Sequence, residues 1–227
     1  ALCVAAPPTT PSYQGPTTFL LYSQKNKISR LLMQPPEEGK QEEVPDILLP
    51  IKRARSIQSV SYDQVEDMIY WVDHARGEQP ARQVIRRVRD TGLTDRLQMF
   101  DRQERFLPFD LAIEPFTWSL YWTCANTNTI NVTRLGRELV PLGPIMLGGT
   151  MDRSRFIAIH PTRQMLYVSM AGEFSGEEGG ARLEMIELGT SERIVLVNTS
   201  VGAISALVVD TEDGRQVYWA DIIGSEN

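Results

Sequence analysis

The chain has 227 residues, of which 42% are hydrophobic and 23% are charged, a composition typical of a folded globular protein rather than a disordered or fibrous one. Its 29 acidic and 23 basic residues give a net charge of -6, which disfavours nucleic acid as a partner because a phosphate backbone requires a broad basic surface. Two cysteines are too few for a small disulfide scaffold, and the sequence shows neither an apolar run long enough to span a bilayer nor a basic n-region of a secretion signal.

A four-residue motif that begins with tyrosine and tryptophan recurs along the chain. Its copies begin at Tyr70, Tyr121, Tyr167 and Tyr218, at spacings of 51, 46 and 51 residues, and a weaker copy begins at Leu21. A fixed period of this length is typical of propellers and solenoids. The third copy has lost both the tryptophan and the aspartate of the motif, so its local strand pairing is uncertain from sequence.

Short apolar segments surround each copy of the motif. An alternating segment precedes it, at residues 57–63, 109–114, 156–160 and 204–210, and further apolar stretches follow it, at residues 129–135, 138–142, 181–188 and 192–197. Four short strands per repeat, separated by turn residues, predict the blade of a β-propeller. The predicted fold class is therefore all-β.

One segment has the periodicity of a helix. Ala81, Val84, Ile85 and Val88 fall at the i, i+3, i+4 and i+7 positions of an amphipathic helix. We nevertheless predict a strand, because the segment occupies the place of residues 130–132 in the next repeat and its β-branched residues suit a strand. A short helix is the alternative.

The repeat count predicts an incomplete propeller. The first blade lacks its opening strand and the fifth ends soon after its motif, so the chain holds about four and a half blades of an expected six. By the same arithmetic roughly 80 further residues would close the ring. Two segments rich in Gly, Pro and Glu, residues 35–45 and 172–180, are interpreted as solvated loops.

The repeats resemble the class B, or YWTD, repeats of the low-density-lipoprotein receptor family, which form six-bladed propellers. The resemblance covers residues 17–221 and is strongest to the fourth propeller of the Arrow-like Wnt co-receptors. It is carried by residues 17–25, by 121–124 together with 130–135, and by 152–155; Cys124 in place of the repeat's aspartate is a departure shared with that propeller. The resemblance implies that residues 1–16 are a linker from the end of a preceding EGF-like module, with Cys3 as its last cysteine, and that residues 17–227 form a C-terminally truncated propeller.

The resemblance also implies a function. It predicts an extracellular propeller in the ectodomain of a single-pass plasma-membrane receptor that binds secreted Wnt proteins and Dickkopf-type inhibitors in Wnt/β-catenin signalling, beside neighbouring propellers and EGF-like modules. No cofactor and no direct membrane contact of this segment are expected. Two alternatives are a propeller of a lipoprotein-type endocytic receptor or nidogen-like matrix protein, and a calcium-dependent propeller hydrolase.

The sequence gives no sign of catalysis. It contains no H-E-x-x-H, G-x-S-x-G or phosphate-loop motif, and the histidines His74 and His160 are too scattered, with the two cysteines, to predict a metal site. A hydrolase would need calcium-binding acidic residues that converge on the central channel.

The recurrent motif is interpreted as structural. A motif that occurs once per blade most simply packs the core between blades, with its aspartates as hydrogen-bond acceptors that tie neighbouring blades. The residues concerned are Tyr70, Trp71, Asp73, Tyr121, Trp122, Tyr167, Tyr218, Trp219 and Asp221.

A ligand face is expected where loops from every blade surround the channel. It should hold the residues just after each motif and just before each inner strand: Lys25, Arg55, His74, Arg76, Asn126, Asp152, Arg153, Arg155 and Glu173. The four arginines among them predict a locally cationic rim that could steer an acidic ligand. A solvated surface role is the alternative for each.

Two covalent features stay open. Asn131 and Asn198 begin N-glycosylation sequons, Asn131 within a stretch that matches the family and Asn198 by the pattern alone. Cys124 is expected to be a buried free thiol, with a disulfide to Cys3 as the alternative.

Overall fold

In the computed structural model every regular element is a β-strand within the described part of the chain. The strands form five antiparallel sheets. The described residues are 19–32, 47–48, 51, 54–75, 82–89, 107–124, 126–127, 129–136, 140–146, 153–171, 181–198, 203–211 and 215–222.

The sheets follow one another in chain order. The first contains β1 (Phe19–Gln24), β2 (Lys27–Leu32) and β3 (Ile47–Leu48), and the second contains β4 (Ile57–Asp63), β5 (Met68–Ala75) and β6 (Arg82–Arg89). The third contains β7 (Pro108–Glu114), β8 (Ser119–Cys124), β9 (Thr129–Arg134) and β10 (Val140–Met146). The fourth contains β11 (Arg153–His160), β12 (Met165–Ala171), β13 (Arg182–Glu187) and β14 (Arg193–Asn198), and the fifth contains β15 (Ala203–Val209) and β16 (Val217–Ile222).

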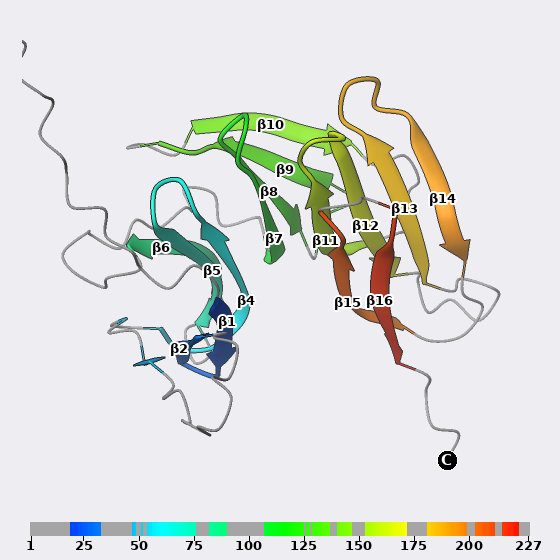
Figure 1. Cartoon of the computed structure of the whole chain (residues 1–227). Coiled ribbons are helices and arrows are strands. Elements are labelled where there is room, and N and C mark those ends of the chain that lie inside the picture. The colour runs from blue at the N-terminus through cyan, green and yellow to red at the C-terminus, as the bar shows by residue number, and fades with distance from the viewer. Residues whose placement is uncertain are drawn as a thin grey trace, which may run out of the picture.

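The sheets fan around a common axis as the blades of an incomplete propeller (Figure 1). The inner strands β4, β7, β11 and β15 contact one another in succession, while β6, β10 and β14 lie at the outside. β1 contacts β4 as β5 contacts β7 and β8 contacts β11, so β1 is a second strand, and no inner strand of the first blade is among the described residues. This confirms the predicted blade order.

The segment with helical periodicity is the strand β6, as predicted. Ile85 joins the core that contains Tyr70 and Leu111, whereas Val88 joins the core that contains Trp71. A blade lies between two neighbours and buries both of its faces, so apolar residues occur at odd and even positions of its strands. This double burial produced the helix-like spacing in the sequence.

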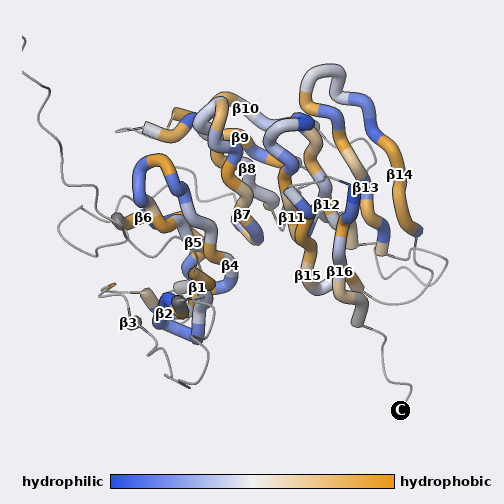
Figure 2. Tube along the Cα trace, in the orientation of Figure 1, coloured by the Kyte–Doolittle hydropathy of each residue, from blue (hydrophilic) through white to orange (hydrophobic). Residues whose placement is uncertain are grey.

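Each motif residue packs toward one neighbouring blade. Tyr70 packs with Leu111 of the next blade, and Trp71 packs with Ile28 of the previous one. The alternation follows from the strand, whose successive side chains point to opposite faces. Figure 2 shows apolar residues recurring along the strands of neighbouring blades, and the core is accordingly divided into layers between blades.

The third repeat pairs regularly although its motif is incomplete. β12 forms a continuous ladder with β13, and Val168 fills the place of the tryptophan at 0% exposure. Buried Met170 stands where the aspartate would be. Apolar burial on both faces is therefore sufficient to keep this strand in its sheet.

Candidate ligand face

The ends of the inner strands divide the propeller into two faces. At one end a tight turn connects each inner strand to the motif strand that follows it, and at the other end the motif strand stops beside the start of its inner strand. The predicted ligand-face residues that the structure describes lie at this second end.

In the second blade Asp73 organises the start of the inner strand. Its Oδ1 accepts hydrogen bonds from the backbone N–H groups of Arg55 (3.0 Å) and Ser56 (2.9 Å), and its Oδ2 lies 3.0 Å from Nε of Arg86. Asp73 is 1% exposed. These bonds hold the segment that enters β4 onto its own sheet, whereas the sequence predicted bonds to a neighbouring blade.

Lys25, Arg55 and His74 gather at this same corner. The backbone N–H of Ile57 donates to the carbonyl oxygen of Lys25 (2.6 Å), and that of His74 donates to the carbonyl oxygen of Ser56 (2.8 Å). Lys25 and Arg55 are exposed and His74 is half-buried. The first and second blades are therefore joined at the predicted face.

In the third blade Asn126 supplies the acceptor that Cys124 lacks. The backbone N–H of Leu107 donates to Oδ1 of Asn126 (3.2 Å) and approaches Sγ of Cys124 (3.4 Å), while the thiol donates to the same Oδ1 (2.9 Å). Leu107 precedes Cys124 by the interval that separates Ser56 from Asp73. Asn126 thus replaces the missing aspartate, and Cys124 is a free cysteine with 0% exposure.

A bulge interrupts each described inner strand near its start, and in β7 and β11 it faces the third position of the motif. The backbone N–H of Asp110 donates to Oγ1 of Thr123 (3.1 Å), and that of Phe156 donates to Oγ of Ser169 (2.9 Å). The Thr123 hydroxyl in turn donates to the carbonyl oxygen of Arg155 in the next blade. A hydroxyl at this motif position therefore satisfies a donor that the bulge removes from the ladder.

Asp110 connects three successive inner strands. Its Oδ1 accepts from the hydroxyl of Ser59 in β4 (2.6 Å), and its Oδ2 accepts from the backbone N–H of Ile157 in β11 (2.9 Å). Burial raises the pKa of the Asp110 carboxyl, and the hydrogen bonds from Ser59 and Ile157 only partly oppose this shift. This tie between blades could have been suspected from a polar residue at an inner-strand position, but the sequence alone does not reveal its partners.

Two phenylalanines and one arginine meet at the bulges of β7 and β11. The rings of Phe109 and Phe156 lie edge to face with centroids 5.2 Å apart, and the guanidinium of Arg155 lies 5.1 Å from the centre of the Phe109 ring. All three residues are half-buried. We call them the aromatic-arginine cluster; only Arg155 was predicted as a ligand-face residue.

The structure describes part of the predicted set. The side chains of Lys25, Arg55, His74, Asn126 and Arg155 are placed as above. Arg153 begins β11 opposite Ala171, and only its backbone is described. Arg76, Asp152 and Glu173 lie outside the described residues. The predicted cationic rim is thus represented by Arg55 and Arg155.

The opposite face carries a second repeated feature, a side-chain cap on three of its tight turns. Oδ1 of Asp63 accepts from the backbone N–H of Val65 (2.9 Å), and Oε1 of Glu114 accepts from that of Phe116 (2.9 Å). Nδ1 of His160, which is 1% exposed, accepts from the backbone N–H of Arg163 (3.3 Å). His160 is therefore a structural residue, and the signal in the sequence was its position at the end of each alternating segment.

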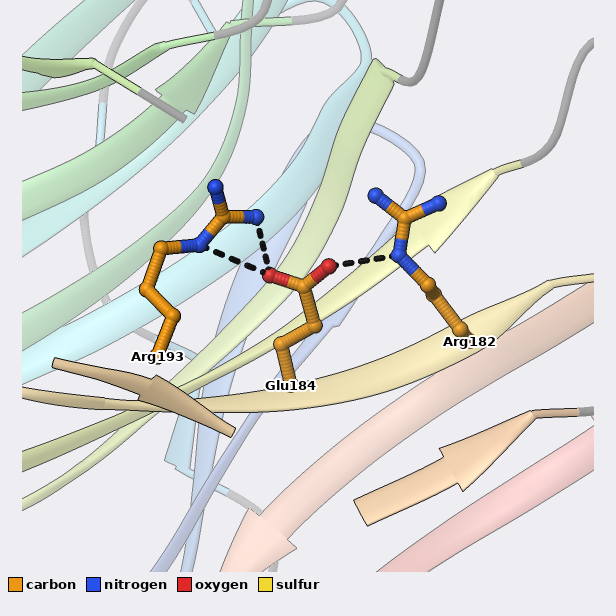
Figure 3. Close-up of polar contacts among 3 residues, drawn as sticks. All are labelled: Arg182, Glu184 and Arg193. Atoms are coloured by element: carbon orange, nitrogen blue, oxygen red, sulfur yellow. Dashed lines mark hydrogen bonds and ion pairs between the residues drawn. The ribbon is translucent and has the colours of Figure 1, made fainter. Parts of the chain in front are cut away.

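A buried carboxylate also ties the outer strands of the fourth blade (Figure 3). Glu184 on β13 accepts from Nε of Arg182 (2.5 Å) and from Nε of Arg193 on β14 (3.1 Å). Burial favours a higher pKa for Glu184, but the hydrogen bonds and charges of the two arginines outweigh it and hold the pKa below its ordinary value.

The two sequon asparagines differ in exposure. Asn131 lies in β9, is 8% exposed and donates through Nδ2 to Oγ1 of Thr129 (3.4 Å). Asn198 ends β14 and is exposed. Among the described residues no group of three or more His, Cys, Asp or Glu side chains could hold a metal ion, and no helix there could cross a membrane.

The fold and the recurrent contacts define this chain as a segment of a YWTD-type β-propeller. Its motif strands pack between blades, Asp73 holds the start of an inner strand, and the hydroxyls of Thr123 and Ser169 accept from the bulges. No protein-family profile matches the chain. It is 35% identical over 221 residues to low-density lipoprotein receptor-related protein 5 of Homo sapiens and, equally, to that of Mus musculus; the match covers 94% of this chain but 12% of each relative. The repeats of this chain are thus similar to those of that receptor-related protein.

Solved structures show the same fold. The crystal structure of a nidogen/laminin complex matches with a TM-score of 0.66 at 22% identity, covering 89% of this chain and 70% of that one. The sequence match is thus to a receptor-related protein, and the structural match supports the propeller fold.

Proposed function

We propose that this chain is part of the extracellular ligand-binding region of a Wnt co-receptor, and that its ligand face binds secreted Wnt proteins or Dickkopf-type inhibitors in Wnt/β-catenin signalling. The observation that carries the proposal is 35% identity to low-density lipoprotein receptor-related protein 5 along nearly the whole chain. The chain spans 12% of that relative, so the partners of the whole protein enter here as part of the proposal.

The aromatic-arginine cluster supports the choice of face. It lies at the start of two neighbouring inner strands, and it combines half-buried aromatic rings with a cation. Aromatic residues and arginine are enriched where protein interfaces concentrate their binding energy. The cluster offers an apolar contact at the centre, with Arg55 and Lys25 exposed at the neighbouring corner.

Charge supports the kind of ligand. The chain as a whole is acidic, yet the described side chains of this face include the cations Lys25, Arg55 and Arg155, whereas Asp73 there is paired with Arg86 and the half-buried Asp110 is hydrogen-bonded. A cationic patch accelerates association with an acidic partner, and salt weakens the effect. We therefore propose that the ligand presents an acidic segment to this face.

The test measures association of a Dickkopf-type inhibitor with the intact receptor chain carrying Arg153→Glu and Arg155→Glu. We expect a lower association rate, with the difference shrinking as salt rises, because two positive charges become negative. Phe109→Ala should instead mainly raise the dissociation rate, because it removes an apolar contact.

Arg155→Glu alone is compared with the single control Arg134→Glu. Arg134 is exposed at the end of β9, on the opposite face, so the same charge reversal there should leave binding unchanged. Equal association rates for the control and for Arg155→Glu would overturn the proposed face. If the unaltered receptor binds neither Wnt proteins nor Dickkopf-type proteins, the proposed function is wrong.

The proposed chain context is an EGF-like module before residue 17 and further propeller sequence after residue 227, in a single-pass plasma-membrane receptor. Mapping the disulfide partner of Cys3 in the secreted protein tests the first part. A partner upstream of residue 1 is expected, with Cys124 recovered as a free thiol, whereas a bond between Cys3 and Cys124 would contradict it.

A further inference from the structure

β14 is an edge strand with an unusual concentration of exposed apolar residues. It ends the fourth sheet, and no other described strand pairs with its outer side. Ile194, Val195 and Leu196 are 45%, 55% and 42% exposed, and Figure 2 shows the strand as largely hydrophobic. Such an edge is a template for pairing with another chain.

The fourth strand of the third blade, β10, is protected in its own sequence. It contains Pro141 and Pro144, which cannot donate to an added strand, and Gly143 with φ of 118° at a bulge. β14 also has a bulge, but it has no proline, glycine or charged residue between Arg193 and Asn198. Some other feature is needed to cover this edge.

Asn198 is placed to provide that cover. The register pairs Asn198 with Arg182 and Val195 with Glu184. Arg182 and Glu184 are two residues apart on β13 and share a face, so Asn198 and Val195 share it too, about 7 Å apart along the sheet. Leu196, the extra residue of the bulge, lies between them. Asn198 is exposed, and the sequence continues Thr199-Ser200, which completes an acceptor sequon.

We propose that Asn198 carries an N-linked glycan that shields the edge of β14 from pairing with other chains. In the modification, the amide nitrogen Nδ2 bonds to C1 of an oligosaccharide held on a lipid diphosphate. The bond from C1 to the diphosphate oxygen breaks, the lipid diphosphate leaves and the amide loses one proton. The bulky, hydrated glycan then lies over the most exposed apolar residue of the strand.

The first experiment is a mass analysis of the protein secreted as its full chain from eukaryotic cells, before and after enzymatic release of N-glycans. We expect a glycan on the peptide that contains Asn198 and its loss in Asn198→Gln and in Ser200→Ala. Ser200→Ala keeps the asparagine, so it separates the effect of the glycan from that of the side chain. An unmodified Asn198 would overturn the proposal.

The second experiment measures self-association by light scattering over a range of concentrations. Asn198→Gln and Ser200→Ala should associate at concentrations where the unaltered protein stays monomeric, and adding Leu196→Lys to Asn198→Gln should restore the monomer by charging the edge. Asn131→Gln is the matched control, because β9 is an interior strand and its backbone is already paired.

If the glycan is present but its removal leaves self-association unchanged, the shielding role is wrong. The ligand-binding assay keeps the two proposals apart, because β14 lies at the outside of the fourth blade and these variants should leave inhibitor binding as it was.

Discussion

Single polar residues at the ligand face hold one blade to itself and to the next. The clearest case is the start of the inner strand, which an aspartate holds in the second blade and an asparagine beside a cysteine holds in the third. Asp73 binds two backbone N–H groups directly, whereas in the next blade Asn126 binds the corresponding backbone and the Cys124 thiol. The motif can therefore lose its aspartate without losing the corner.

Asn126→Ala should destabilise the third blade although it lies two residues outside the motif. The Leu107 N–H would keep only the weak sulfur acceptor and the Cys124 thiol would lose its acceptor, at a cost of about 1 to 2 kcal/mol. Urea unfolding of the intact protein measures the change. The equally conservative Asn26→Ala, in the exposed turn after β1, is the control, and equal free energies of unfolding for the two variants would contradict this role.

Glu184 should make stability fall in acid. Its pKa is lowered in the folded protein, so its contribution is complete above the ordinary value of 4.5 and is lost as pH falls through the lowered value. Glu184→Gln should therefore destabilise the protein at pH 7, by about 1 to 3 kcal/mol, and have little effect in strong acid. The free energies of unfolding of the variant and of the unaltered protein are measured at both pH values. A difference between the two proteins that does not depend on pH would contradict the prediction.

Asp110 should make the stability of the folded protein fall as pH rises. Its raised pKa means that the folded protein binds the proton more tightly, so its contribution weakens as pH rises from the ordinary value of 3.8 through the raised value. Asp110→Asn should remove this slope while keeping one acceptor for Ser59. Free energies of unfolding at a series of pH values from 3.8 upward measure how stability depends on pH. If the variant keeps the pH dependence of the unaltered protein, Asp110 is not its cause.

At the scale of the element, the bulged inner strand and the hydroxyl opposite it form one unit. The unit occurs with Thr123 and with Ser169, while the second blade has the buried Val72 at this motif position. Val72 pairs regularly with Ser59, whereas Thr123 and Ser169 lie opposite a bulge, so the hydroxyl occurs where a backbone donor needs an acceptor.

Thr123→Val should consequently keep the fold but lower its stability. The substitution leaves the Asp110 N–H without its acceptor beside the channel and the Arg155 carbonyl without its donor, a loss of about 1 to 3 kcal/mol. Thermal unfolding checks it, with Thr211→Val at an exposed position after β15 as the control. A variant as stable as the unaltered protein would show that water replaces the hydroxyl at no cost.

At the scale of the whole molecule, each blade completes the core of the blade before it. Tyr121 and Tyr167 are 9% and 4% exposed because a following blade covers them, whereas Tyr218 is 54% exposed beside Val208 at 58%. No described sheet follows β15 and β16, so the same residue type in the same motif has a different environment.

Truncation of these tyrosines should reveal that difference. In the 227-residue chain, Tyr167→Ala should cost about 3 to 5 kcal/mol because it empties a buried layer, and Tyr218→Ala should cost less than about 1 kcal/mol. Chemical denaturation of the two variants gives the comparison. Equal losses would mean that Tyr218 is covered in solution and that this face is not open.

The sequence by itself determined the class of fold, the order of the blades and the interpretation of residues 82–89 as a strand. These properties repeat along the chain and depend on local alternation and turn residues, which each copy displays independently. It also marked the motif positions, while the ligand face stays a prediction.

Only the tertiary structure decided which polar groups meet. Ser59 and Ile157 reach Asp110 from 51 and 47 residues away, and Arg155 reaches Thr123 from 32 residues away, since they lie in neighbouring blades. The aromatic-arginine cluster likewise depends on how blades stack. Contacts between repeats follow from the rotation between blades, and a linear pattern gives the period of that rotation but not the side chains it brings together.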